Sequence, residues 1–121
     1  IAKILVENYN GNVPEKKEEL MKLPGVGSKT ANIVLSMGFH LNYIAVDTHV
    51  HRIFNRLGIV KTKYPEETEK ELMRIVPEDY WIRINSVFVE FGKKICRPIG
   101  PKCSICPLLE QCEYGKNVVK K

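Results

Sequence analysis

The sequence predicts an all-α fold, and three observations support this prediction. Apolar residues recur at spacings of three, four and seven, as they do along one face of a helix. Proline and glycine separate these stretches at the points where helices begin and end. The one stretch that suits a strand, NYIAV at residues 42–46, is short and has no partner. We therefore expect helices joined by turns, without internal repeats or low-complexity segments.

Three short helices are predicted in the first third of the chain. Residues 1–8 have apolar side chains at helical spacing, and the stretch NYNGNVP then forms a turn. A second helix is expected over residues 14–23, because proline and glutamate at its start are typical of helix N-termini. The sequence PGVG follows as a hairpin, and a third helix is expected over residues 28–37, where Gly38 stops it.

Three longer helices are predicted further along the chain. The first follows Asp47 and ends at Gly58, and its buried stripe consists of Val50, Ile53, Phe54 and Leu57. The second begins at Pro65, has two glutamates in its first turn and closes before Pro77. The third spans residues 80–95, with a stripe of Trp81, Ile84, Phe88, Phe91 and Ile95. By this reading, residues 1–95 form one helical region.

Length and charge restrict the function classes. A chain of 121 residues suits one domain, and it is short for a two-domain enzyme. The net charge of +5 and the pI near 9.0 would attract a polyanion such as nucleic acid, or serve solubility alone. No apolar stretch approaches the roughly 18 residues of a membrane span, and no signal peptide is visible. The start at Ile1, without methionine and already helical in pattern, indicates a fragment or a processed product.

The four cysteines are confined to residues 96–112, with the spacing C-x6-C-x2-C-x5-C at Cys96, Cys103, Cys106 and Cys112. Such crowding indicates one shared ligand. Two disulfides would suit a secreted protein, for which no signal is present. Zinc accepts four thiolates but usually takes two separated C-x2-C pairs. An iron–sulfur cluster also takes four thiolates, and the proline and glycine between the first two cysteines would let the backbone wrap it. The spacing favours the cluster and leaves zinc open.

The stretch LPGVGSKTA at residues 23–31 indicates a phosphate site. Glycines at positions 25 and 27 can adopt positive φ and allow close approach of a DNA backbone, while the apolar residues anchor the turn from beneath. Amides at the following helix start would hold phosphate. An ordinary helical hairpin is the alternative. The candidate nucleic-acid contacts here are Leu23, Gly25, Val26, Gly27, Ser28 and Thr30.

Two charged side chains near helix starts are candidates for chemistry. Lys29 is either a phosphate partner or a nucleophile, and burial would have to remove its proton, since a helix N-terminus disfavours the ammonium by only ~0.3–1 kcal/mol. Asp47 is expected to cap its helix, which contributes about 1 kcal/mol and keeps the carboxylate ionised. His49, Arg52 and Arg56 share one face of that helix, which is either solvated or follows a DNA strand.

The motifs LPGVGSKTA, IAVDTHVHRIFNRLG and the cysteine spacing, in this order, resemble the endonuclease III branch of the helix-hairpin-helix DNA glycosylases. Lys29 and Asp47 are 18 positions apart, as is the catalytic pair of that family. The resemblance runs from residue 1 to about residue 115. It implies a partial helix-hairpin-helix architecture over residues 1–95, an iron–sulfur loop over residues 96–112 and a tail over residues 113–121.

The resemblance also implies an activity. Lys29 would attack C1′ of a flipped, damaged nucleotide in duplex DNA, expel the base and form a Schiff base whose β-elimination nicks the strand. Asp47 would activate this lysine or support the oxocarbenium ion. The cysteines would carry a [4Fe–4S] cluster that shapes a basic loop containing Arg97 and Lys102. The expected substrates are oxidised pyrimidines or abasic sites, and Lys29 argues against the adenine-specific branch, which lacks this lysine.

Two departures from the family and one gap accompany the resemblance. EFGKKIC stands where members often carry a His-Gly-Arg stretch, and Ser28 occupies a position that is frequently basic. The family has roughly another half-chain before Ile1, so we expect an N-terminal segment or a second polypeptide to complete an otherwise monomeric protein. The expected location is intracellular: cytoplasm and nucleoid, or nucleus or organelle in a eukaryote. The alternative function is a non-catalytic DNA-binding module, or an inactive fragment with a structural metal site.

Overall fold

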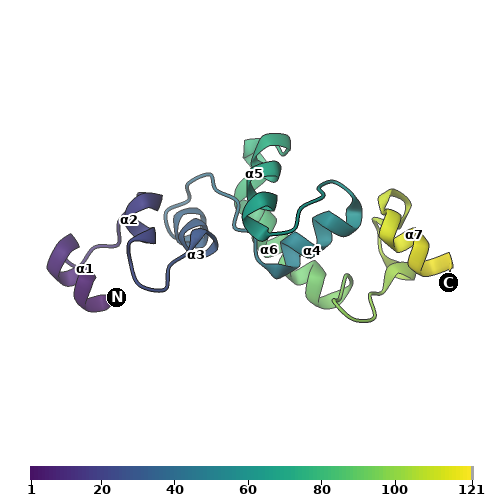
Figure 1. Ribbon diagram of the computed structural model, residues 1–121, viewed down its shortest axis with the longest axis horizontal. Coiled ribbons are helices and arrows are strands. Elements are labelled where there is room, and N and C mark those ends of the chain that lie inside the picture. Colours follow the sequence, from purple (N-terminus) through teal and green to yellow (C-terminus); the bar gives the residue numbers. More distant parts are fainter. Residues whose placement is uncertain (121) are drawn as a thin grey trace.

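The computed structural model describes residues 1–120 of the chain, and the all-α prediction is confirmed over this range (Figure 1). Helices α1, α2 and α3 lie toward one end of the long axis, α4, α5 and α6 lie together in the middle, and α7 lies at the other end. They are α1 (Ala2–Tyr9), α2 (Lys17–Met21), α3 (Ser28–Ile33), α4 (Thr48–Leu57), α5 (Pro65–Ile75), α6 (Trp81–Lys94) and α7 (Glu113–Lys120). Short 3₁₀ turns cover Glu78–Tyr80, Cys103–Ile105 and Leu109–Gln111.

Three elements differ from the sequence prediction. Helix α2 begins at residue 17 instead of 14, because the first helical bond of this turn runs from the Leu20 amide to the Lys16 carbonyl at 3.0 Å. Helix α3 stops at residue 33 and continues as a π-helix over Val34–Gly38, a wider turn that sequence periodicity does not predict. The stretch interpreted as a tail forms α7 over Glu113–Lys120, and Lys121 lies outside the described residues.

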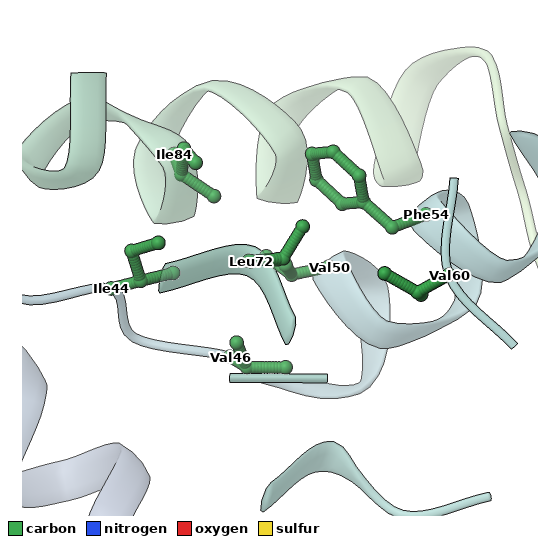
Figure 2. Close-up of a cluster of buried hydrophobic side chains, with 7 residues drawn as sticks. All are labelled: Ile44, Val46, Val50, Phe54, Val60, Leu72 and Ile84. Carbon is green, nitrogen blue, oxygen red and sulfur yellow. The ribbon is translucent and has the colours of Figure 1, made fainter. Parts of the chain in front are cut away.

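The larger apolar core lies between α4, α5, α6 and the segment that precedes α4. Its side chains point toward one another in Figure 2 and are nearly inaccessible to solvent. The core consists of Ile44, Val46, Val50, Phe54, Val60, Leu72 and Ile84. Val50 and Phe54 of the α4 stripe predicted from the sequence face this core. Ile53 and the half-buried Leu57 face the cysteine loop instead. Burial of this kind stabilises the fold by about 25 cal/mol for each Å² of apolar surface.

A second, separate core holds the N-terminal helices together. Four buried residues form its centre, and apolar side chains of α1 and of the hairpin pack around them. The four are Leu20, Leu23, Ala31 and Leu35. Leu23 and Val26 thus anchor the hairpin from beneath, as predicted. The two cores share no residue, so apolar packing alone does not fix how α3 sits relative to α5.

Helices α4 and α6 approach each other closely at Gly92. A Cβ atom at this position would lie 2.7 Å from His49 Nδ1 and 2.8 Å from Arg52 Nη2. The missing side chain therefore makes room for two polar side chains of α4. Among residues 1–120, no helix is long and apolar enough to cross a membrane.

We expect Gly92→Ala to lower the free energy of unfolding by about 1–3 kcal/mol, because the added methyl group overpacks the α4–α6 contact. Urea unfolding followed by circular dichroism measures this difference. Gly38→Ala is the matched control, since a Cβ at Gly38 meets nothing within 4 Å. Equal stability of the Gly92→Ala variant and the unmodified chain would contradict this account of the contact.

Candidate active site and cysteine cavity

The hairpin between α2 and α3 places main-chain amides at an exposed turn. Gly25 has φ +79°, a conformation that favours glycine, and both Gly25 and Gly27 have open space where a side chain would stand. Gly27 does not use positive φ: it is extended, at φ −102° and ψ −170°, as the residue that caps α3 usually is. Thr30 is exposed beside it. The predicted nucleic-acid contacts of this turn stay a prediction.

Lys29 and Asp47 line the same cleft, which has an accessible volume of about 200 Å³. Lys29 lies in the first turn of α3 and is exposed, so its own chain does not supply the burial considered from the sequence. Only a molecule bound in the cleft could therefore shield this amine from water. The remaining lining residues are Ser28, Val46, Thr48, Pro65, Glu66 and Glu69.

Asp47 caps α4, as its sequence context predicts. Its backbone is extended, at φ −101° and ψ −169°, and its Oδ1 accepts a hydrogen bond from the Val50 amide at 2.9 Å. The helix N-terminus also favours negative charge at this point. The second carboxylate oxygen remains for a group in the cleft.

Two buried asparagines hold the segment that leads to Asp47. Asn32 of α3 donates to the Ile44 carbonyl at 2.7 Å, and Asn85 of α6 donates to the Ala45 carbonyl at 3.0 Å. This segment is extended without a strand partner, so its buried carbonyls need such donors. Side chains from two helices therefore fix the path of the chain into the cleft, a role that sequence analysis did not assign.

Glu69 is a buried carboxylate at the edge of the cleft, and sequence analysis also missed it. It accepts hydrogen bonds from Ser28 Oγ at 2.9 and 3.1 Å, from Asn32 Nδ2, and from Lys17 Nζ at 3.2 Å. A usable signal was present, because Glu69 stands three residues before Leu72 and four before Met73, in the apolar stripe of α5. A glutamate in such a stripe requires partners.

The basic face of α4 turns toward the cysteine loop. Arg52 donates to the carbonyls of Gly92 at 3.2 Å and Cys96 at 2.7 Å, and it lies 2.9 Å from His49 Nδ1. Burial and neighbouring Arg56 lower the pKa of Arg52 below its usual value. The guanidinium is thus engaged within the chain, and so is His49. Their predicted contacts with nucleic acid remain untested, while the structure gives both an internal role.

Arg56, one turn further along α4, ties down the cysteine loop itself. It donates to the carbonyls of Arg97 at 2.8 Å and Pro98 at 3.0 Å, and to Cys96 Sγ at 3.4 Å. Its guanidinium also lies 4.4 Å from the ring centre of Tyr114 in α7. One side chain therefore links α4, the loop and the C-terminal helix.

All four cysteines line one cavity. Burial, followed by the charges of the other three thiols, raises the pKa of Cys103. Gly115 lets α7 close over this site, because a Cβ there would meet Leu109 Cδ1 at 3.1 Å. Apolar walls from α4 and α6 complete the cavity, including Ile53, Leu57 and Phe91.

The donor atoms around the cavity decide which group it could hold. No group of three His, Cys, Asp or Glu side chains within residues 1–120 is arranged around a single ion. The four thiols nevertheless line one small cavity, and sulfur is the donor that iron–sulfur clusters and zinc both take. The donor set therefore fits a group bound by four thiolates.

Comparison with known proteins identifies relatives for most of the chain. The family model described as "HhH-GPD superfamily base excision DNA repair protein" matches residues 1–78. Endonuclease III of Thermotoga maritima is 60% identical over 99% of this chain and 58% of its own length. Endonuclease III of Bacillus subtilis is 46% identical over 100% of this chain and 56% of its own length. The chain thus spans a little over half the length of these curated relatives.

Solved structures agree with this result. A non-covalent endonuclease III–DNA complex superimposes with a TM-score of 0.92 at 45% identity, covering 98% of this chain and 56% of that one. A trapped endonuclease III–DNA covalent intermediate gives 0.91 at 45% identity, covering 97% and 55%. A thermostable thymine-DNA glycosylase gives 0.84 at 26% identity, covering 95% and 55%.

We expect Asp47→Ala to lower the free energy of unfolding by about 1 kcal/mol, whereas Asp47→Asn should change it by only a few tenths, because asparagine caps helices nearly as well as aspartate. Urea unfolding of both variants measures the difference. An Asp47→Asn variant as unstable as Asp47→Ala would show that the charge of the carboxylate, and not its hydrogen bond, stabilises α4.

Proposed function

Because the chain belongs to the HhH-GPD superfamily of base excision DNA repair proteins, we propose that it acts on duplex DNA as a DNA glycosylase with abasic-site lyase activity. The observation that supports this most strongly is the shared cleft of Lys29 and Asp47, which opens directly behind the glycine hairpin. An amine and an ionised carboxylate at one cleft suit attack on a sugar carbon. The relatives named endonuclease III, and the solved DNA complexes similar to this chain, support the same reaction class.

In the proposed reaction, the hairpin amides hold the phosphate backbone while the damaged nucleotide leaves the duplex and enters the cleft. The bound sugar displaces water from around the exposed Lys29. The amine nitrogen then forms a bond to C1′ as the bond from C1′ to the base breaks, and the base departs with the bonding electron pair. Loss of the nitrogen proton and ring opening give a Schiff base, and β-elimination breaks the strand on the 3′ side.

Asp47 supports this sequence in two ways. Its carboxylate accepts the proton that the amine releases, and its negative charge stabilises the positive sugar as the base departs. The hydrogen bond from the Val50 amide fixes the orientation of this carboxylate at the start of α4. Oxidised pyrimidines and abasic sites are the proposed substrates. DNA as the partner implies an intracellular location, with the chain acting as part of a monomer.

We propose further that Cys96, Cys103, Cys106 and Cys112 hold a [4Fe–4S] cluster. Their convergence on one apolar-walled cavity supports a group larger than a single ion. When bound, the cluster supplies a fixed scaffold for the loop that carries Arg97 and Lys102. The chain's own contribution is the anchoring of this loop, since Arg56 holds its carbonyls and leaves Arg97 and Lys102 exposed toward an approaching polyanion.

Borohydride is expected to trap a covalent adduct between the protein and abasic duplex DNA. The test uses the 121-residue chain and a chimera in which the chain replaces its matching residues in the Thermotoga maritima relative. Lys29→Ala should abolish the adduct, and Asp47→Asn should slow its formation by roughly 10²–10⁴-fold, the usual contribution of a general acid or base. Lys70→Ala removes one exposed lysine from α5 and serves as the control.

Persistence of the adduct in Lys29→Ala at the unmodified level would place the nucleophile elsewhere. DNA binding without any adduct, together with Asp47→Asn behaving as unmodified protein, would instead indicate a non-catalytic DNA-binding module.

The protein purified without oxygen should be brown, with absorbance at about 400 nm and about four irons per chain, as a [4Fe–4S] cluster held by four thiolates requires. Absorption spectra and metal analysis check this. Cys103→Ser should lose colour and iron, while Ser104→Ala, an exposed neighbour in the same loop, should keep both. A colourless protein with one zinc per chain would show that the cavity holds zinc.

A further inference from the structure

We propose that Glu69 is a positioning residue for the reaction of Lys29, an inference that rests on the proposed function. Glu69 as a whole residue is only 8% exposed, yet it lines the same cleft as Lys29 and Asp47. It belongs to α5, whereas Ser28, Asn32 and Lys17, which donate to it, belong to the hairpin helices α2 and α3. One side chain therefore connects α5, which packs in the larger core, to α2 and α3, which pack in the smaller core.

The geometry of these contacts fixes the start of α3. Ser28 is the residue directly before Lys29, and its Oγ lies 2.9 Å from Glu69 Oε2 and 3.1 Å from Oε1. Asn32 stands four residues later on the same face of α3 and donates to the same carboxylate. Two contacts one turn apart set both the rotation and the height of α3 relative to α5. The direction in which Lys29 leaves the helix is set with them.

The Glu69 carboxylate also affects the position of Asp47, through Asn32. The Nδ2 group of Asn32 contacts both Glu69 and the Ile44 carbonyl, which lies three residues before Asp47. Glu69 thus orients the amide that holds the segment leading to Asp47. Lys29 and Asp47 belong to elements that pack in different apolar cores. The polar contacts of Glu69 and Asn32 therefore fix the positions of these two side chains relative to each other.

The positive charge of Lys17 compensates the negative charge of the buried Glu69 carboxylate. Lys17 Nζ lies 3.2 Å from Glu69 Oε1, and the two side chains are 25% and 11% exposed. The pair is buried enough that loss of one partner leaves an uncompensated charge. An apolar residue of similar volume could fill the same space, but it could not fix the rotation of α3, because apolar contacts are not directional.

The test is a double-mutant cycle of Ser28→Ala and Glu69→Gln in the form of the protein, chain or chimera, that yields the borohydride adduct. The rate of adduct formation is measured at saturating abasic DNA. The dissociation constant is measured separately, by fluorescence anisotropy on a duplex with an uncleavable tetrahydrofuran site. Circular dichroism confirms that each variant is folded.

We expect Glu69→Gln to slow adduct formation at saturation by roughly ten- to hundredfold, the effect of a small misplacement of a reacting group, with the dissociation constant within about twofold. Ser28→Ala should slow it less, because the Asn32 contact remains. The double variant should be no slower than Glu69→Gln, since both changes remove one interaction. Ser28→Thr, which keeps the hydroxyl, should restore most of the rate.

Glu71→Gln is the matched control, because Glu71 lies on the same helix and pairs with exposed Arg74. An unchanged rate in Glu69→Gln would overturn the inference, and so would losses that multiply in the double variant. If Glu69→Gln does not fold, Ser28→Ala and its rescue by Ser28→Thr decide the question alone. An unchanged rate in Glu69→Gln, or losses that multiply in the double variant, would leave the proposed function standing as long as Lys29→Ala still abolishes the adduct. An adduct that does not need Lys29 would overturn both.

Discussion

The two apolar cores have to be held at a fixed angle, and polar side chains meet this requirement at the cleft. The hydrophobic effect stabilises each core, but it is not directional and does not determine how the two cores are oriented relative to each other. Three features lie between the two cores: the buried carboxylate of Glu69, the buried side chains of Asn32 and Asn85, and the segment at residues 44–46. Buried hydrogen bonds are more specific than apolar packing, because each loses much more when its geometry changes. The cleft lies where directional contacts replace apolar ones.

Helix α4 illustrates how one element serves two sites. Its first turn is capped by Asp47 at the cleft, and its last turn carries Arg56 against the cysteine loop. The polarity of the helix suits both ends, since a carboxylate is favoured at the N-terminus and a guanidinium at the C-terminus. Between them, the buried stripe fixes the helix on the larger core. The spacing of charged and apolar residues in one ten-residue helix thus locates the cleft relative to the cysteine cavity.

Local signals in the sequence predicted much of this structure. Glycine and proline located the hairpin, periodic apolar residues located the helices, and the position of Asp47 before its stripe predicted the cap. The sequence did not predict what depends on long-range partners. The internal roles of Arg52 and Arg56 and the buried carboxylate of Glu69 follow from contacts between residues tens of positions apart. The periodicity of apolar residues identifies the buried face of a helix, but it does not identify the residues elsewhere in the chain that contact this face.

The cysteine cavity has walls from four parts of the chain, and the last of these is α7, with Gly115 against Cys112. An occupant bound by all four sulfurs is enclosed once that helix has docked. Its arrival must therefore precede docking, or α7 must swing outward to admit it. Binding of such an occupant would be coupled to the docking of α7, since bound metal contributes its binding energy to folding. A cell that delivers the occupant late would accumulate chains with an undocked C-terminal helix, exposed to proteases.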